Sequence, residues 1–339
     1  MENTINNLEP SNEETSGVNF KSRLDLTPLS EGVLNIKREL ETVIVGQHKM
    51  IDQLLVALLS NGHILIEGVP GVAKTITAKI LAKTLSVDFS RIQFTPDLMP
   101  SDILGTSVFD LKKSEFEFKK GPIFSNLILI DEINRAPAKT QSALFEVMEE
   151  RQITIDGVCY ELEKPFIVLA TQNPIEQEGT YRLPEAQLDR FLFKINVDYP
   201  NLNEEVSIIQ REHTLQNHGK LDNIKTILTG DDIKKFQDIV KQIIVEENLI
   251  EYIAKLVVNT RENAFLYLGA SPRASIAILN AAKGFAAIRG RDFVTPEDIK
   301  DAAIPVLQHR VIVTPEREME GLTSIEIIKQ IIETIEIPR

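Results

Sequence analysis

The chain has 339 residues, with 37 basic and 50 acidic side chains and a formal net charge of −13. Hydrophobic residues make up 43% and charged residues 26%, a balance typical of a folded globular protein that excludes a disordered chain, a collagen-like repeat and a disulfide scaffold. The acidic balance argues against a stand-alone nucleic-acid binder, since such proteins usually carry a basic face.

Three further features narrow the class of protein. Cys159 is the only cysteine, so neither an intrachain disulfide nor a multi-cysteine zinc site can form. The longest apolar runs fall short of the about 20 residues that a membrane helix needs, so no membrane segment is expected. The N-terminus has no basic start and no apolar run, which argues against a signal peptide and favours a cytoplasmic location.

The beginning of the chain is polar. Residues 1–30 are acidic and short of apolar side chains, which predicts a disordered acidic tail. Val33, Ile36 and Leu40 then recur at helical spacing and predict a first helix. A second helix is predicted over residues 49–60.

Five short apolar runs follow, separated by segments that are mostly long enough for crossover helices. Apolar runs of this length without strict alternation are typical of strands buried on both faces of a parallel sheet. Residues 31–200 are therefore predicted to form a three-layer αβα domain around a parallel sheet. The predicted strands cover residues 63–68, 89–95, 127–131, 166–173 and 191–197.

The sequence pattern changes after residue 200. Helical spacing dominates residues 201–339, for example at Ile233, Phe236 and Val240, and strand-like runs are few. The second part of the chain is therefore predicted to be a smaller, all-helical domain.

The first predicted strand runs into a phosphate-binding loop of the form G-x-x-x-x-G-K-[ST], except that Ala73 replaces the second glycine. Backbone N–H groups of such a loop hold a phosphate, and the following helix adds its partial positive charge. Lys74 is expected to reach the β- and γ-phosphates, and Thr75 to offer a hydroxyl to Mg²⁺. Ala73 is tolerable if its φ is negative, with Gly68 and Gly71 at the tighter positions.

Two later strands end in polar side chains. Asp131 and Glu132 follow the run 127–131, at the sheet edge where ligands of parallel sheets bind. Asp131 is predicted to hold Mg²⁺, and Glu132 to activate the attacking water as a general base. Asn173 ends another strand and could bond the γ-phosphate or orient that water; an ordinary Asn-Pro turn is the alternative.

Two arginines are candidates for stabilising transition-state charge. Arg190 could insert into the site of an adjacent subunit as an arginine finger, or it could merely pair with Asp189. Arg273 opens a helix of the second domain and could reach back to the γ-phosphate. For Arg273 the alternative is a surface arginine near a helix N-cap.

Four segments together resemble the MoxR-type AAA+ ATPases, and the resemblance covers about residues 30–335. They are GVPGVAKT (68–75), LILIDEINRAPAKTQSALFEVMEERQITIDG (127–157), LATQNPIEQEGTYRLPEAQLDRF (169–191) and GASPRA (269–274). The resemblance implies an AAA+ P-loop core followed by a helical lid, with ATP and Mg²⁺ as cofactors. Ala73 is itself typical of these sequences.

The resemblance also implies a role for each matching residue. Asp131 and Glu132 are Walker B, Asn173 is sensor 1, Arg190 is the arginine finger and Arg273 is sensor 2. Val45 and Gly46 resemble the segment beside the adenine. Walker A comprises Gly68, Val69, Pro70, Gly71, Val72, Ala73, Lys74 and Thr75.

Two insertions are typical of this branch of AAA+ proteins. One is expected over residues 96–121, and the other is a hairpin over 152–164 with its turn at Asp156-Gly157, a dipeptide that independently favours a hairpin. Such hairpins usually point toward the pore of a ring or toward a partner.

The implied function is that of a chaperone-like remodelling ATPase. It would work as a homo-oligomer, a hexameric ring with ATP at the subunit interfaces. It would assist the maturation or assembly of a client protein, including metal or cofactor insertion, with a von Willebrand factor A domain protein as a further partner.

Three alternatives stay open. A magnesium-chelatase-like ATPase subunit is not excluded, although residues 127–191 fit the MoxR type better. A nucleic-acid motor is disfavoured by the net charge and because acidic residues intersperse the lysines at 112–113 and 119–120. A nucleotide switch without hydrolysis would be favoured only if Glu132, Asn173 or Arg190 were missing.

Overall fold

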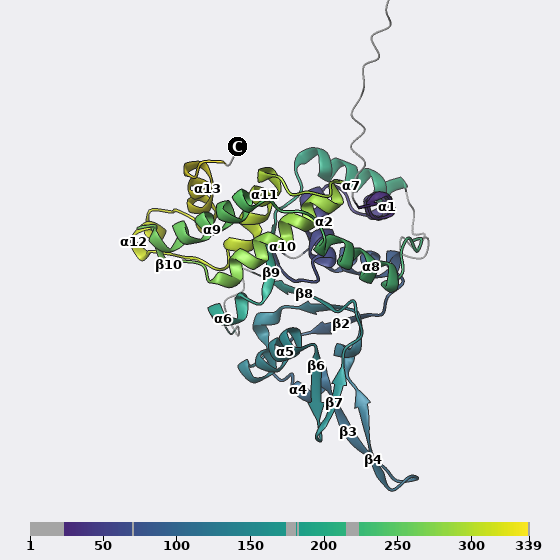
Figure 1. Ribbon diagram of the computed structural model, residues 1–339. Coiled ribbons are helices and arrows are strands. Elements are labelled where there is room, and N and C mark those ends of the chain that lie inside the picture. Colours follow the sequence, from purple (N-terminus) through teal and green to yellow (C-terminus); the bar gives the residue numbers. More distant parts are fainter. Residues whose placement is uncertain (1–23, 70, 174–180, 182, 215–223, 338–339) are drawn as a thin grey trace, which may run out of the picture.

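The computed structural model describes residues 24–337, except 70, 174–180, 182 and 215–223 (Figure 1). The tail predicted at residues 1–23 lies outside this part. At residues 24–30 the prediction of a tail is wrong, because α1 already begins at Thr27 and both Leu26 and Leu29 are buried. The hydrophobic cluster under α1 fixes these residues.

The first two hundred residues contain the strands and helices of an α/β unit. In chain order they are α1 (Thr27–Val43), α2 (His48–Leu59), β1 (His63–Gly68), α3 (Lys74–Thr84), β2 (Phe89–Gln93), α4 (Pro100–Leu104), β3 (Gly105–Asp110), β4 (Glu115–Lys120), the 3₁₀ turn Pro122–Phe124, β5 (Leu127–Asp131), the 3₁₀ turn Ile133–Arg135, α5 (Ala138–Glu150), β6 (Gln152–Ile155), β7 (Val158–Glu161), β8 (Ile167–Gln172), α6 (Glu185–Leu188) and β9 (Phe191–Val197).

The five strands predicted from apolar runs form one sheet in the order β2-β5-β8-β1-β9, with every neighbouring pair parallel. Side chains alternate between its two faces. Ile64 and Ile66 belong to one hydrophobic cluster and Leu65 to the other, and all three are buried. The prediction of a parallel sheet buried on both faces is confirmed.

Helices cover each face of the sheet (Figure 1). The first cluster includes side chains of α1, α2 and α3, whereas the second includes side chains of α4 and α5. This is the three-layer arrangement that the sequence predicted, and it places the carboxyl ends of β1, β5 and β8 side by side.

The remainder of the chain is mainly helical. It contains α7 (Leu202–Thr214), α8 (Gly230–Lys241), α9 (Glu247–Glu262), β10 (Leu266–Leu268), α10 (Pro272–Ile288), α11 (Pro296–Leu307), β11 (Ile312–Val313), α12 (Pro315–Met319) and α13 (Ser324–Thr334). The short antiparallel pair of β10 and β11 corrects the prediction of an all-helical region. Within the described residues, every helix is too short or too polar to cross a membrane.

The helices of this second part pack on the first part. Side chains of α8, α9, α10, α11 and α13 join the same hydrophobic cluster as α1 to α3. In addition, the buried Gln237 on α8 donates its Nε2 to the Leu58 carbonyl oxygen at 2.8 Å. A division of the chain at residue 200 stays a prediction, since one cluster contains residues from both sides of it.

Two β-hairpins project from the sheet on the side away from α9–α13 (Figure 1). Strands β3 and β4 pair within the insertion expected at 96–121, and β6 and β7 form the expected hairpin. Asp156 and Gly157 both have positive φ, of 51° and 79°, as a tight hairpin turn requires. The hairpins contact each other where Phe118 lies against Tyr160, with ring centroids 4.6 Å apart.

The start of α1 can be tested by stability. Leu29→Ala removes a fully buried side chain and should lower the free energy of unfolding by about 2–5 kcal/mol. Leu34→Ala, on the same helix but 47% exposed, should change it by less than about 0.5 kcal/mol. Urea denaturation followed by circular dichroism measures both. Equal effects would mean that α1 does not pack as described.

Candidate functional site

The phosphate loop joins β1 to α3 at the carboxyl edge of the sheet. Gly71 has φ +89°, which favours glycine. Ala73 has φ +61°, so the expectation of a negative φ there is wrong. Ala73 is the residue immediately before α3, and the loop passes through the left-handed region there before it enters the helix. Pro70 lies outside the described residues.

Gly68 is the second glycine that the loop requires, because the backbone of β9 passes close to it. A Cβ on Gly68 would lie 2.7 Å from the Val197 carbonyl oxygen of β9. Lys74 donates its Nζ to the Gly68 carbonyl oxygen at 2.5 Å. Partial burial lowers the pKa of Lys74, and the nearby carboxylates of Asp131, Glu132 and Glu67 oppose that shift. Lys74, the first residue of α3, thus lies near the carboxylates that end β5.

The remaining residues of the loop are placed by α3. Val72 is buried, with 6% of its surface exposed, and joins the cluster under the sheet, where Val69 packs against it. Thr75 lies half-buried in the first turn of α3. The loop is thus anchored by its apolar side chains, while Lys74 and Thr75 begin the helix.

The structure brings the predicted carboxylates and Asn173 next to this loop. Strand β8 lies between β5 and β1, with Ile130 opposite Ala170 and Glu67 opposite Gln172. The residues that follow these strands, namely Asp131, Glu132 and Asn173, therefore end at the same edge as Gly68. Asp131 and Asn173 are each 7% exposed.

Asp131 and Glu132 are held by polar neighbours. Asp131 Oδ2 accepts from Arg91 Nε at 2.6 Å, and Oδ1 accepts from the Thr171 hydroxyl at 3.3 Å. The backbone N–H of Glu132, a residue with φ +57°, donates to Thr171 Oγ1 at 3.0 Å. Thr171 thereby links both carboxylate residues to β8.

The Glu132 side chain is also restrained. Its Oε2 accepts from Gln93 Nε2 at 2.9 Å and lies 3.2 Å from the Arg135 guanidinium. Arg91 and Gln93 were not predicted as site residues. Arg91 and Gln93 are two residues apart on β2. Because side chains of a strand alternate between its faces, the sequence alone would have placed both on the same face. Nothing in the sequence says that this face meets Asp131 and Glu132.

The donor set fits a magnesium ion. The Thr75 hydroxyl and the Asp131 carboxylate are hard oxygen ligands of the kind that Mg²⁺ takes beside a phosphate. Asp131 is also the more buried of the two acids that end β5, with 11% side-chain exposure against 28% for Glu132. An ion there would share the Asp131 carboxylate with Arg91.

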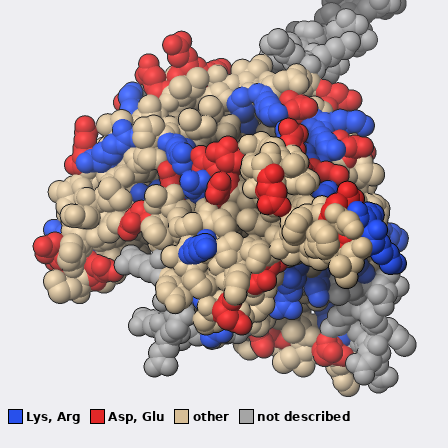
Figure 2. All heavy atoms as spheres, turned by 90° about the horizontal axis from the view of Figure 1, so that it is seen from below, with Lys and Arg blue, Asp and Glu red and all other residues tan. Residues whose placement is uncertain are grey.

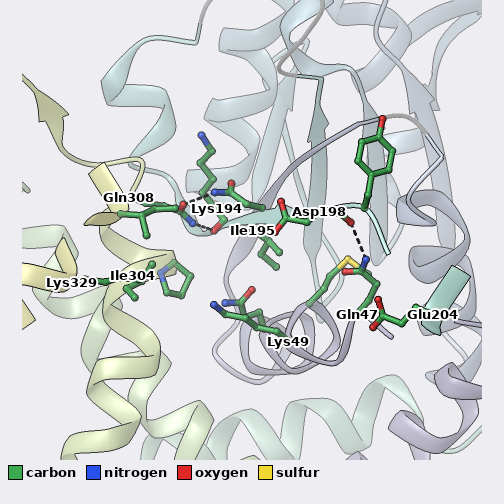
Figure 3. Close-up of a pocket in the computed structure, with 15 residues that line it drawn as sticks. Gln47, Lys49, Lys194, Ile195, Asp198, Glu204, Ile304, Gln308 and Lys329 are labelled. Atoms are coloured by element: carbon green, nitrogen blue, oxygen red, sulfur yellow. Dashed lines mark hydrogen bonds between the residues drawn. The ribbon is translucent and has the colours of Figure 1, made fainter. Parts of the chain in front are cut away.

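A cavity of about 490 Å³ lies between the end of β9 and helices α2, α11 and α13 (Figure 3). Gln47 follows Val45 and Gly46, and its Nε2 donates to the Asp198 carbonyl oxygen at 3.3 Å on one wall. Residues of α11 and α13 form the facing wall. Asp198, which Gln47 contacts, directly follows Val197, and Val197 pairs with Gly68 at the end of β1. A role for Val45 and Gly46 beside an adenine stays a prediction.

The two candidate arginines lie at the opposite end of the sheet. Phe191, the first residue of β9, pairs with His63, the first residue of β1. Arg190 directly precedes β9 and therefore lies at the amino edge of the sheet. Arg190 and Arg273 line a cavity of about 300 Å³ together with His63 and Glu149. Arg273 therefore lies at the other edge of the sheet from the phosphate loop of the same chain. Its expected reach to a γ-phosphate stays a prediction.

Both arginines pair with the same carboxylate. Arg190 forms an ion pair with Glu149 Oε2 and also donates to the Phe145 carbonyl oxygen at 3.0 Å. Arg273 donates to Glu149 Oε1 at 3.0 Å. The alternative of an Arg190–Asp189 pair is not observed, because Asp189 accepts from Arg310 Nε at 2.7 Å.

Comparison with known proteins agrees with this geometry. Residues 63–193 match the ATPase family associated with various cellular activities (AAA), and residues 258–331 match the AAA lid domain. The fold and the loop are therefore those of an AAA+ ATPase, and the lid follows the sheet as predicted.

Individual relatives show which family of AAA+ ATPases the chain belongs to. The chain is 44% identical to the uncharacterised protein YeaC of Bacillus subtilis, over 93% of this chain and 96% of YeaC. It is 43% identical to Chaperone MoxR1 of Mycobacterium tuberculosis, over 92% of this chain and 82% of MoxR1. A crystal structure from Cytophaga hutchinsonii, provisionally assigned as an ATPase, superposes with a TM-score of 0.84 at 44% identity, over 91% of this chain and 96% of that one. The chain belongs to the MoxR family of AAA+ ATPases.

The left-handed turn at Ala73 can be tested by substitution. Ala73→Gly should raise the free energy of unfolding by up to about 1 kcal/mol, because glycine avoids the clash of a Cβ at positive φ but gains freedom in the unfolded chain. Ala78→Gly, within α3, should lower it by about 1 kcal/mol. Urea denaturation gives both values, and a loss of stability in Ala73→Gly would contradict the described loop.

The restraint on Glu132 predicts a faster enzyme when it is removed. Gln93→Ala removes one of the two groups that engage Glu132 Oε2 and leaves Arg135 in place. We expect kcat for ATP hydrolysis to rise about 2- to 10-fold, the equivalent of one hydrogen bond. Gln152→Ala, an exposed position on β6, should leave kcat unchanged. A lower kcat in Gln93→Ala would show that the amide instead positions Glu132 for catalysis.

Proposed function

We propose that this chain is the ATP-hydrolysing subunit of a homo-oligomeric ring that remodels a client protein. The resemblance to MoxR-type AAA+ ATPases implies that the ring is a hexamer. The observation that carries the proposal is the separation of the site's parts. The phosphate loop, Asp131, Glu132 and Asn173 are at the carboxyl edge of the sheet, whereas Arg190 is at the amino edge. Head-to-tail contact between copies brings such edges together and closes into a ring.

Each residue has a chemical task in this proposal. The loop N–H groups and Lys74 hold the β- and γ-phosphates, and Thr75 and Asp131 hold Mg²⁺. The bound Mg²⁺ ion neutralises phosphate charge. Glu132 accepts a proton from the attacking water as the new P–O bond forms and the bond to ADP breaks. Asn173 orients that water.

The neighbouring copy completes the site. Arg190 from the adjacent subunit stabilises the charge that develops on the γ-phosphate, and Arg273 arrives beside it from the lid of the same adjacent subunit. Val45 and Gly46 lie against the base in this proposal, and the next residue, Gln47, lines the cavity of Figure 3. Hydrolysis then changes the contact between one subunit's loop and the next subunit's lid.

The two hairpins are the proposed contact with the client. Phe116 and Leu111 on the β3–β4 hairpin are 72% and 85% exposed, which suits contact with a protein chain. Similarity to Chaperone MoxR1 supports a chaperone role. Maturation of the client, metal or cofactor insertion, a von Willebrand factor A domain partner and a cytoplasmic location follow from the family resemblance alone.

A nucleic-acid motor has less support. Lys113 pairs with Glu117 at 3.7 Å, and Lys120 lies 5.1 Å from the centroid of the Phe124 ring. On the face seen in Figure 2, basic and acidic side chains are mixed instead of forming one continuous basic surface. Phosphate-backbone binding depends on such a surface.

Two substitutions test the proposal. Glu132→Gln keeps the shape of the side chain but removes the base, so kcat should fall by about 10²- to 10⁴-fold with nucleotide affinity retained. Arg190→Ala should lower kcat by about 10³-fold or more, again with affinity retained. Arg38→Ala, an exposed arginine on α1, is the control. Full activity in Arg190→Ala would refute a shared site.

A further inference from the structure

Glu149 holds two cations that come from different parts of the chain. It lies near the end of α5 in the α/β part, as does Phe145, whose carbonyl oxygen fixes Arg190. Arg273 lies in the first turn of α10 in the helical part. One Glu149 oxygen pairs with each guanidinium, so a single carboxylate bridges the two arginines. Their relative position is therefore set by this side chain.

Electrostatics explain why such a bridge is needed. Two guanidinium groups at the same place repel each other unless an anion lies between them. The Glu149 and Arg190 side chains are 36% and 29% exposed, so water screens their attraction less than it screens a fully exposed pair. The three groups together keep a net charge of +1, which still attracts a phosphate.

Two charged residues next to this bridge, Asp189 and Arg310, are engaged with each other. Asp189 is engaged by Arg310, and it also accepts from the Ser271 hydroxyl at 3.0 Å. The Arg310 guanidinium donates further to the Asp189 and Val306 carbonyl oxygens. Arg310 is buried and Asp189 is partly buried, and their pair supports the start of α10. Glu149 holds the partly buried Arg190 and the exposed Arg273.

We propose that Glu149 is a positioning residue for hydrolysis in trans: it holds Arg190 and Arg273 as a pair directed at the γ-phosphate bound by the adjacent subunit. The inference rests on the proposed function, because it needs Arg190 to act on a neighbour's ATP. Glu149 itself touches neither the nucleotide nor the water. A purely structural bridge between α5 and α10 is the alternative.

The first test is the kinetics of Glu149→Ala. Loss of the bridge misplaces both arginines, so kcat should fall by about 10- to 100-fold. KM for ATP should stay unchanged, because the loop that binds ATP is intact. Glu149→Asp, which keeps the charge, should recover part of kcat. Glu150→Ala is the matched control, since the exposed Glu150 makes no ion pair within the described part of the chain.

The second test separates action in trans from damage to the subunit itself. Glu149→Ala subunits keep their own loop and Glu132, whereas Glu132→Gln subunits keep a correctly held arginine pair. A mixture should hydrolyse ATP faster than the sum of the two variants measured alone, because Glu132→Gln neighbours supply the arginines. A mixture no faster than that sum would overturn the proposal in favour of a structural bridge.

The outcomes also distinguish this inference from the proposed function. If Arg190→Ala is fully active, the shared site itself is refuted. If Arg190→Ala is inactive while Glu149→Ala behaves as wild type, only the role of Glu149 is refuted. If thermal unfolding or size-exclusion chromatography shows that Glu149→Ala does not fold or assemble, Glu149→Gln replaces it in both assays, since it keeps the shape without the charge.

Discussion

The polarity of the parallel sheet determines where every part of this site lies. Strands β1, β5, β8 and β9 run in the same direction, so the residues that follow them gather at one edge and those that precede them gather at the other. Strand β1 has six residues, which separates the edges by about 17 Å at the usual rise per residue. Arg190 and the phosphate loop stand at opposite ends of this span. In the proposed function a second copy brings them together.

The same geometry joins the helical region to the chemistry. Helices α8 to α11 share one hydrophobic cluster with α1, α2 and α3, so α10 is packed against the body of the protein along its length. Its first turn carries Arg273, which stands at the amino edge and pairs with Glu149.

Much of the fold was predictable because it depends on local patterns. Apolar runs predicted the five strands, and the phosphate-loop motif predicted the start of α3. The dipeptide Asp156-Gly157 predicted the second hairpin. The start of α1 was missed because Leu26 and Leu29 are isolated apolar residues in a polar segment. Strands β10 and β11 have three and two residues, too few for a periodic signal.

The site was predictable in its parts and less so in its arrangement. The residues at the carboxyl edge were found because strand ends carry them. The φ of Ala73 does not follow from the one-letter pattern, since it depends on how the loop enters α3. The side on which Arg273 lies depends on how α10 packs, and the contacts of Arg91 and Gln93 depend on β2 being next to β5. These are tertiary relations without a local signature.

The most direct measurement is the ATP hydrolysis rate per subunit as the concentration of the wild-type chain rises from nanomolar to tens of micromolar. A site divided between two copies predicts a rate per subunit that climbs steeply and then saturates as the subunits associate. Light scattering on the same samples reports the association. A rate per subunit that stays constant while scattering shows the chain passing from monomer to oligomer would contradict the divided site.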